Sequence, residues 1–490
     1  MQPVFQSIST LAGGALAIYL LGRLFSSRNE ILACCTAVII VLAARTLLFT
    51  PVPGQLAAEE WLSSSQDFLM FGDSFWPGEA ASRLIAAIAL ALGFLVSIFS
   101  ATYLELDRRY KTYYPLLLLT IAGLVGMVYA RDLFLLYLFL EWMSVCAYVL
   151  VAFRRNTNTA IEAGFKYLIM GSSGTILFLL GLAWIYRDTG QIIIPQQAWT
   201  AGLWARAGLV CALIGLGIKS ALVPLHTWLP DAHGRAPSSI SAMLSGILIQ
   251  GCFFVWLRVA LGMGIPPATV GIVLLFLSFA NMITGNLMAL VQTHVKRLLA
   301  FSSIAQMGYI MFSFGIGLRF GLPQAIQAGF IYIAIHAALK SLAFLSKGVC
   351  HFYCHTTTLK EMQGIARQLP LPALTMTIAL AGLSGLPPLA GFSGKWFILA
   401  TALDTNHPLA LAGTVLFLTN SLVSLGYYLP FIVLLFTQPS AHAGRTLRLQ
   451  PSVWVILPLV IISSLILAAS FYPSPWIHWL APPAVWLSGG

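Results

Sequence analysis

The sequence contains few charged residues. Asp, Glu, Lys and Arg make up 8% of its 490 residues, whereas ordinary soluble domains carry roughly 25%. Hydrophobic residues make up 59% of the chain, and the mean hydropathy is +0.88. This composition excludes a large soluble enzyme, a disordered chain and a fibrous protein. Because a spanning helix needs about 20 apolar residues, the length allows more than ten crossings, and we expect a polytopic membrane protein.

Acidic residues and cysteines are also scarce. The chain has 15 Asp and Glu against 26 Lys and Arg, for a formal net charge of +11. In a soluble protein this excess would suggest a nucleic-acid partner, but no basic patch is interleaved with aromatic residues, so that function is not expected. Of the 7 cysteines, most lie inside apolar runs, where a free thiol behaves as a small apolar side chain, and no disulfide framework is expected; these are Cys34, Cys35, Cys146, Cys211 and Cys252.

Long apolar runs predict an all-α fold with about fourteen transmembrane helices. One of these runs, at 372–400, is interrupted in its middle by prolines. The predicted segments are 8–22, 31–49, 84–103, 114–130, 133–153, 167–186, 204–223, 238–261, 267–291, 298–318, 322–346, 372–400, 409–436 and 452–472.

Basic residues concentrate in the odd-numbered loops between these segments. The even-numbered loops are poorer in Lys and Arg, and the long loop at 50–80 holds Glu59, Glu60, Asp67, Asp73 and Glu79 without a basic residue. By the positive-inside rule, we expect the odd-numbered loops in the cytoplasm and both termini outside. The basic residues that carry this prediction are Arg23, Arg28, Arg108, Arg109, Lys111, Arg154, Arg155, Arg235, Lys296, Arg297, Lys347, Lys360, Arg367, Arg445 and Arg448.

Two proline-containing segments resemble each other. Residues 220–226 (SALVPLH) and 384–390 (SGLPPLA) match at four of seven positions, 164 residues apart. Pro224, Pro387 and Pro388 remove backbone donors, so we expect helix breaks there and carbonyl groups near Val223 and Leu386 without helical partners. Paired broken helices are typical of transporter repeats with sites near mid-membrane, although chance similarity between Leu- and Pro-rich segments is the alternative.

Four ionisable residues lie inside apolar runs: Glu141, Lys219, Lys340 and Lys395. Each costs about 2.5–3.5 kcal/mol at the centre of a bilayer on insertion scales, which favours a functional role over a structural one. The structural alternatives are ion pairs that hold helices together and, for Lys395, a side chain that extends to the membrane surface.

Two pairs of ionisable residues are predicted to transfer protons. Burial lowers the proton affinity of a lysine, and a nearby carboxylate restores it by a comparable amount. Glu141 with Lys219 is therefore predicted to form a switch between proton holding and proton release. His336 and Lys340, four residues apart on one predicted helix face, form a second predicted relay.

The motifs around these residues resemble a known family, the proton-conducting antiporter-like membrane subunits. This family includes core membrane subunits of respiratory complex I, large subunits of multi-subunit sodium/proton antiporters and membrane subunits of membrane-bound hydrogenases. The resemblance covers about residues 100–435. It rests on residues 217–233 (GIKSALVPLHTWLPDAH), 236–246 (APSSISAMLSG), 296–309 (KRLLAFSSIAQMGY), 336–345 (HAALKSLAFL) and 385–395 (GLPPLAGFSGK).

The resemblance implies two inverted five-helix repeats, each with one proline-broken helix. It implies units at 1–105 (three N-terminal helices), 106–265 (first repeat), 266–436 (second repeat) and 437–490 (C-terminal helix and tail). Along a hydrated polar axis, protons would pass between the residues that match the motifs of the family: Glu141, Lys219, His336, Lys340 and Lys395. His226 and His233 match signature histidines for which loop anchoring is favoured over proton transfer.

Two positions depart from the family pattern. Gln250 stands where the family usually has Lys or His, and a glutamine cannot take up a proton, so the axis must pass through water there or be interrupted. His294 stands where an Asp usually precedes the Lys296–Arg297 pair. The motif from Cys350 to His355 (CHFYCH) resembles a widened haem c attachment sequence or a metal cluster, but its expected cytoplasmic position argues against haem c.

We therefore expect a proton-translocating membrane subunit of a redox-driven pump, similar to NADH-quinone oxidoreductase or a membrane-bound hydrogenase. No phosphate loop, dinucleotide fingerprint or cysteine set for a cluster is visible, so no metal or redox cofactor is expected in this chain and such cofactors are expected in partner subunits. The expected partners are other membrane subunits, including further antiporter-like ones, in a prokaryotic cytoplasmic membrane. The alternative is the large subunit of a cation/proton antiporter or of an ion-coupled inorganic-carbon uptake complex.

Overall fold

The computed structural model describes residues 2–24, 29–48, 80–107, 109–154, 158–194, 202–438 and 450–472. This part of the chain is all-α, and its only β-type pairings are two isolated bridges. Its α-helices are α1 (Gln2–Leu24), α2 (Asn29–Leu48), α3 (Ala80–Tyr103), α4 (Tyr110–Tyr129), α5 (Leu133–Val151), α6 (Asn158–Thr189), α7 (Leu203–Lys219), α8 (Trp228–Arg235), α9 (Ser238–Met243), α10 (Ile249–Gly262), α11 (Pro267–Leu290), α12 (Val295–Phe320), α13 (Pro323–Cys354), α14 (Pro370–Ser384), α15 (Ala390–Leu403), α16 (Pro408–Phe436) and α17 (Val453–Phe471).

Each of the fourteen predicted segments overlaps one of these helices or a pair of them. Within the described residues, 12 helical stretches are long and apolar enough to cross a membrane. The two predicted segments without such a stretch are 204–223, which ends with α7 at Lys219, and 372–400, which is divided into α14 and α15. The chain is thus an integral membrane protein with many spans, and its two exceptions are the helices interrupted by proline.

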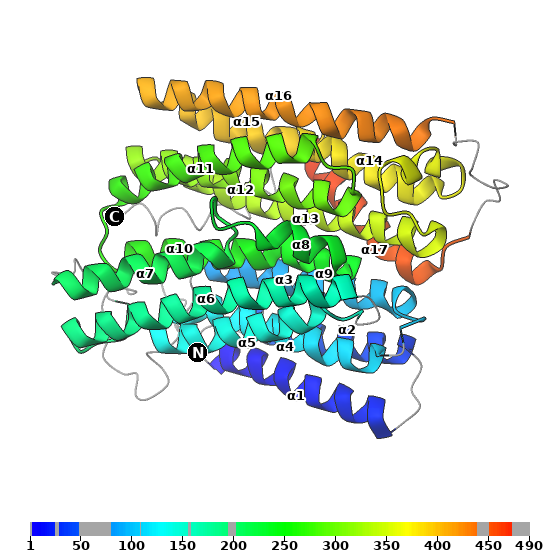
Figure 1. Ribbon diagram of the computed structural model, residues 1–490, viewed down its shortest axis with the longest axis horizontal. Helices are drawn as coiled ribbons and strands as arrows, with labels where there is room; N and C mark the ends of the chain where they lie inside the picture. Colours follow the sequence, from blue (N-terminus) through cyan, green and yellow to red (C-terminus); the bar gives the residue numbers. More distant parts are fainter. Residues whose placement is uncertain are drawn as a thin grey trace.

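The helices lie roughly parallel to one another, and α5, α7, α10, α13 and α15 follow one another from the lower to the upper part of the view (Figure 1). Contacts between specific residues join each of these neighbours to the next. They are Lys219 with Ser144, Trp256 with Leu213, Gln250 with His336, and Gly394 with Tyr332.

The loops separate into two groups at opposite ends of the bundle. At one end, Ser452 bonds to Thr102 and Tyr353, and backbone bonds join Leu359 to Thr293; all of these residues border odd-numbered loops. At the other end, Leu133 bonds to Ile192, and both border even-numbered loops. The alternation that the hydropathy pattern predicts is therefore present in the structure.

Basic residues are less strictly confined to the odd-loop end than the sequence pattern indicated. Arg131, Arg187 and Arg319 border even-numbered loops. Every lysine, in contrast, lies either at the odd-loop end or at a buried position inside the bundle. Several predicted positions lie outside the described residues: the acidic loop at 50–80, apart from Ala80, and Arg28, Arg108, Arg155, Arg445 and Arg448.

Two glycines allow the second broken helix to form. Gly385 ends α14 with a φ of +84°, a conformation that glycine adopts without a steric cost. Gly391 lies so close to α14 that a Cβ atom would stand 1.8 Å from the Gly382 carbonyl oxygen. The two halves of this helix therefore pack backbone against backbone beside the break.

Candidate functional site

The predicted cations are enclosed by protein. Lys219 and Lys395 are 3% and 4% exposed, and His336 and Lys340 are fully buried. Glu141, in contrast, is half-buried, between the exposed side chains of Leu138 and Val145 on the outer side of α5. Because the cations do not face lipid, each must find its polar partners inside the bundle.

Lys219 is the last residue of α7 and contacts α5. Its ammonium group donates to Ser144 Oγ at 2.7 Å and to the Tyr148 hydroxyl at 2.5 Å, and it lies 5.0 Å from the centre of the Tyr148 ring. Glu141, Ser144 and Tyr148 are three and four residues apart, so they share one face of α5. The lysine at the first break is thus held by hydroxyl groups.

Glu141 does not form an ion pair with Lys219 in the described structure. Its Oε2 is buried without a hydrogen-bond partner, while its charge is still close enough to act electrostatically on the lysine. The predicted switch therefore lacks a direct contact in this structure, and Ser144 and Tyr148 take the positions beside the ammonium group.

His336 and Lys340 lie one turn apart on α13 and contact different neighbours. His336 Nδ1 contacts the side-chain amide nitrogen of Gln250 on α10. Lys340 donates to the Leu299 carbonyl oxygen at 2.9 Å and to the Ser302 hydroxyl, both on α12. This pair therefore lies where α10, α12 and α13 meet.

Lys395 follows the second break and donates back across it. Its ammonium group bonds to the carbonyl oxygens of Leu383 and Ser384 at 3.1 and 3.2 Å and to Ser421 Oγ at 3.0 Å. It also lies 4.7 Å from the centre of the Tyr309 ring. The lysine thus donates hydrogen bonds to carbonyl groups that the end of α14 leaves without helical partners.

Side chains satisfy the backbone at both breaks. At the first break, Trp228 donates to the Ile218 carbonyl at 2.8 Å, and Asn281 accepts from the Val223 amide at 2.8 Å. At the second, Gln306 donates to the Leu383 carbonyl at 2.9 Å. The Leu386 carbonyl, expected to lack a partner, accepts from Leu389 at 3.1 Å. The two matching sequence segments thus coincide with the two breaks.

Sequence reasoning missed the hydroxyl partners and one buried cation. Ser144, Tyr148 and Ser302 are polar residues at helical spacing within apolar runs, and that spacing was the available signal. Arg258, 1% exposed on α10, donates to the Val128 and Ala130 carbonyls at the end of α4. These two bonds satisfy carbonyl groups at the end of α4.

The remaining predicted histidines lie toward the odd-loop end. His233 is fully buried, stacks on Phe344 at 4.9 Å, and has no hydrogen-bond partner on either ring nitrogen. His226 is half-buried, with no partner on Nδ1. His294 precedes α12 and pairs through its backbone with Thr358. Loop anchoring by His226 and His233 therefore stays a prediction.

The loop after α13 is held by a carboxylate. Glu361 Oε2 accepts from the Thr357 and Thr358 amides at 2.5 and 3.0 Å. The backbone N–H groups of Thr358 and Thr357 favour the charged form and lower the pKa of Glu361 to about 2.

The cysteines of residues 350–355 do not form a metal cluster in the described part of the chain. Cys350 is fully buried, and the Cys354 thiol donates to Gln368. Across the described residues, no three His, Cys, Asp or Glu side chains come together as metal ligands would.

Comparison with known proteins identifies the family. Residues 130–422 match the model described as NADH:quinone oxidoreductase/Mrp antiporter, TM. NADH-quinone oxidoreductase subunit N of Rubrobacter xylanophilus is 31% identical over 89% of this chain and 88% of its own length. F(420)H(2) dehydrogenase subunit N of Methanosarcina mazei is 29% identical over 82% of each chain.

A solved structure agrees with this result. A chain of respiratory complex I from Thermus thermophilus with bound aureothin superimposes with a TM-score of 0.76 and 26% identity, over 97% of this chain and 99% of that one. The matched region contains Glu141, both helix breaks and all the buried lysines discussed above. The chain therefore belongs to the NADH:quinone oxidoreductase/Mrp antiporter transmembrane family.

Proposed function

We propose that this chain is a proton-translocating membrane subunit of a multi-subunit, redox-driven pump, of the subunit N type. Protons would be taken up and released at Glu141, Lys219, His336, Lys340 and Lys395. The names of the relatives support this type, because both are N subunits of multi-subunit dehydrogenases. The electron carriers would reside in partner subunits.

One observation carries the proposal. Lysine side chains on α7, α13 and α15, helices that succeed one another across the bundle, point into protein and bond to hydroxyl and carbonyl groups. Burial of several cations without carboxylate partners is costly. Lysines bonded to hydroxyl and carbonyl groups, two of them beside helix breaks, fit groups that gain and lose protons, since these partners can also accept from a neutral amine.

The orientation and the internal repeat belong to the same proposal. Cytoplasmic odd-numbered loops, both termini outside, and inverted repeats at 106–265 and 266–436 would put the two breaks in equivalent positions. The placement of every exposed lysine at the odd-loop end supports this orientation.

The test is Lys219→Ala in the assembled complex. We expect proton pumping into vesicles to be abolished, because the ionisable group at the first break is gone, while electron transfer in detergent is partly retained. Lys360→Ala, which removes an exposed lysine of the loop after α13, is the control and should pump normally. Unchanged pumping by the Lys219 variant would overturn the proposal.

Copurification separates the proposal from its alternative. Subunits that contain iron–sulfur clusters, flavin or nickel should copurify with this chain. If only small membrane subunits or a zinc subunit accompany it, the alternative of an antiporter or carbon-uptake complex replaces the redox-driven pump.

A further inference from the structure

Gln250 lies in the first predicted repeat and contacts His336 of the second. It lies on α10, two residues after the π-helical turn Leu244–Leu248, a distortion that often marks functional sites. Gln250 and His336 are both fully buried. The Gln250 amide contacts His336 Nδ1, while Gln250 Oε1 and His336 Nε2 have no hydrogen-bond partner.

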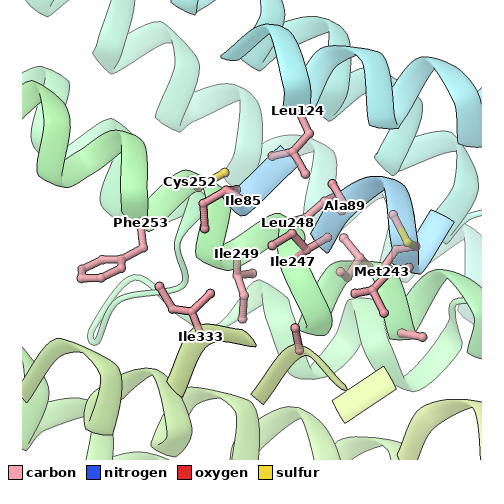
Figure 2. Close-up of a cluster of buried hydrophobic side chains, with 14 of the residues drawn as sticks. Ile85, Ala89, Leu124, Met243, Ile247, Leu248, Ile249, Cys252, Phe253 and Ile333 are labelled. Carbon is pink, nitrogen blue, oxygen red and sulfur yellow. The ribbon is translucent and has the colours of Figure 1, made fainter. Parts of the chain in front are cut away.

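Apolar side chains pack around the stretch of α10 that carries Gln250. Figure 2 shows Ile249 and Cys252 from the same helix, Leu124 from α4 and Ile333 from α13 around this stretch of α10. In such a medium an unpaired polar group costs free energy, and an unpaired charge costs much more. A protonated His336 therefore needs an acceptor for its Nδ1–H, and a neutral ring that holds its proton on Nε2 needs a donor at Nδ1.

The side-chain amide of glutamine can meet both needs. Its nitrogen donates to Nδ1 of the neutral imidazole, as the observed contact places it. After half a turn about the last side-chain bond, Oε1, now without a partner, accepts from the Nδ1–H of the imidazolium. A lysine or a carboxylate at position 250 would instead favour one charge state of the ring.

We propose that Gln250 is a positioning residue that follows the protonation state of His336 by rotating its amide. The proton path then continues between the two halves through His336 while residue 250 stays neutral. This inference rests on the function proposed above. The added proton comes from the Lys340 ammonium group or from internal water and binds Nδ1; on release it passes to internal water. Only N–H and O–H bonds change, and Gln250 neither gains nor loses a proton.

Two substitutions in the assembled complex, reconstituted in vesicles, test this role. Gln250→Met keeps the length of the side chain but removes both amide functions. Pumping per electron should fall about tenfold, the effect of losing one hydrogen bond to a charged group, while uncoupled electron transfer stays within about twofold. Gln191→Met, at an exposed loop position, is the matched control and should leave both rates unchanged.

Gln250→Glu keeps the shape of the side chain but can only accept while it is ionised. Its carboxylate should hold the imidazolium, so pumping should require a more alkaline pH than in the native protein. Lys340, one turn from His336 on α13, is the charged group that acts electrostatically on the ring, and it is unchanged in this variant. The pH profile is a readout that a merely structural role would not move.

The outcomes separate this inference from the proposed function. Normal pumping by Gln250→Met, or an unshifted pH profile of Gln250→Glu, overturns the role of the amide. If Gln250→Met assembles poorly, the pH profile of Gln250→Glu alone tests the role of the amide. If Lys219→Ala abolishes pumping while the Gln250 variants behave as the native protein, only the amide inference fails. If Lys219→Ala also pumps normally, the proposed function fails.

Discussion

At the scale of single residues, the buried lysines are defined by what they bond to. Lys219 and Lys340 each contact a serine hydroxyl, and Lys395 contacts Ser421 Oγ together with two carbonyl oxygens. Neutral hydroxyl partners stabilise an ammonium group less than a carboxylate does, and they also serve a neutral amine. This environment leaves both protonation states accessible, as proton transfer requires.

The hydroxyl of Tyr148 gives a prediction at this scale. Tyr148→Phe removes the 2.5 Å bond to Lys219 but keeps the ring beneath the ammonium group. Pumping should fall by about fivefold, since a hydrogen bond contributes about 1 kcal/mol. The measurement is acidification of vesicles that contain the assembled complex. Tyr137→Phe on the same helix is the control, and equal pumping by both variants would contradict the prediction.

At the scale of secondary-structure elements, the broken helices position the site. Each break leaves backbone groups that a neighbouring side chain satisfies, and two of these side chains are amides from other helices: Asn281 of α11 at the first break and Gln306 of α12 at the second. At the second break, Lys395 and Gln306 both donate to the Leu383 carbonyl. The same polar contacts therefore stabilise the break and hold the ionisable group.

The close approach of α14 and α15 gives a prediction for this element. In Gly391→Ala the added Cβ would stand 1.8 Å from the Gly382 carbonyl oxygen, so the two half-helices must separate. The protein should lose about 1–3 kcal/mol of stability, measured as an earlier thermal unfolding transition in detergent. The control is Gly13→Ala on α1, where no atom lies within 4 Å of the added Cβ. An unchanged transition in the Gly391 variant would show that α15 can shift freely.

At the scale of the whole molecule, two segregated sets of loops define the orientation. Hydrogen bonds join odd-numbered loops to one another at one end and even-numbered loops at the other. Lysine, but not arginine, is confined to the odd-loop end outside the buried sites. Because short basic loops remain in the cytoplasm during insertion, this asymmetry predicts which end faces the cytoplasm.

Cysteine labelling in intact cells checks that orientation. In a Cys354→Ser background, Gln191→Cys should react with a membrane-impermeant maleimide from outside. Lys360→Cys should react only after the cells are permeabilised, because it lies at the opposite end, which is predicted to face the cytoplasm. Both positions are exposed, so access to the side chain does not limit the reaction. The reverse pattern would place the termini in the cytoplasm.

The sequence by itself determined the membrane class, the helical segments and the positions of both breaks. These follow from local properties, because the length of an apolar run determines whether it can span a membrane and proline interrupts a helix in any surroundings. The intramembrane residues Glu141, Lys219, Lys340 and Lys395 were also identifiable, since a charge in an apolar run is costly whatever surrounds it. The roles assigned to them, and the boundaries of the repeats, stay predictions.

Only the tertiary structure decided which groups these residues contact. It placed Ser144 and Tyr148 beside Lys219, left Glu141 without a direct ion pair, and brought Gln250 against His336 across 86 residues of sequence. Such contacts depend on how helices pack and rotate against one another, and serines and glutamines in an apolar run carry no charge that would single them out. Partner choice is a property of the packed bundle, whereas the cost of a buried charge is a property of the residue.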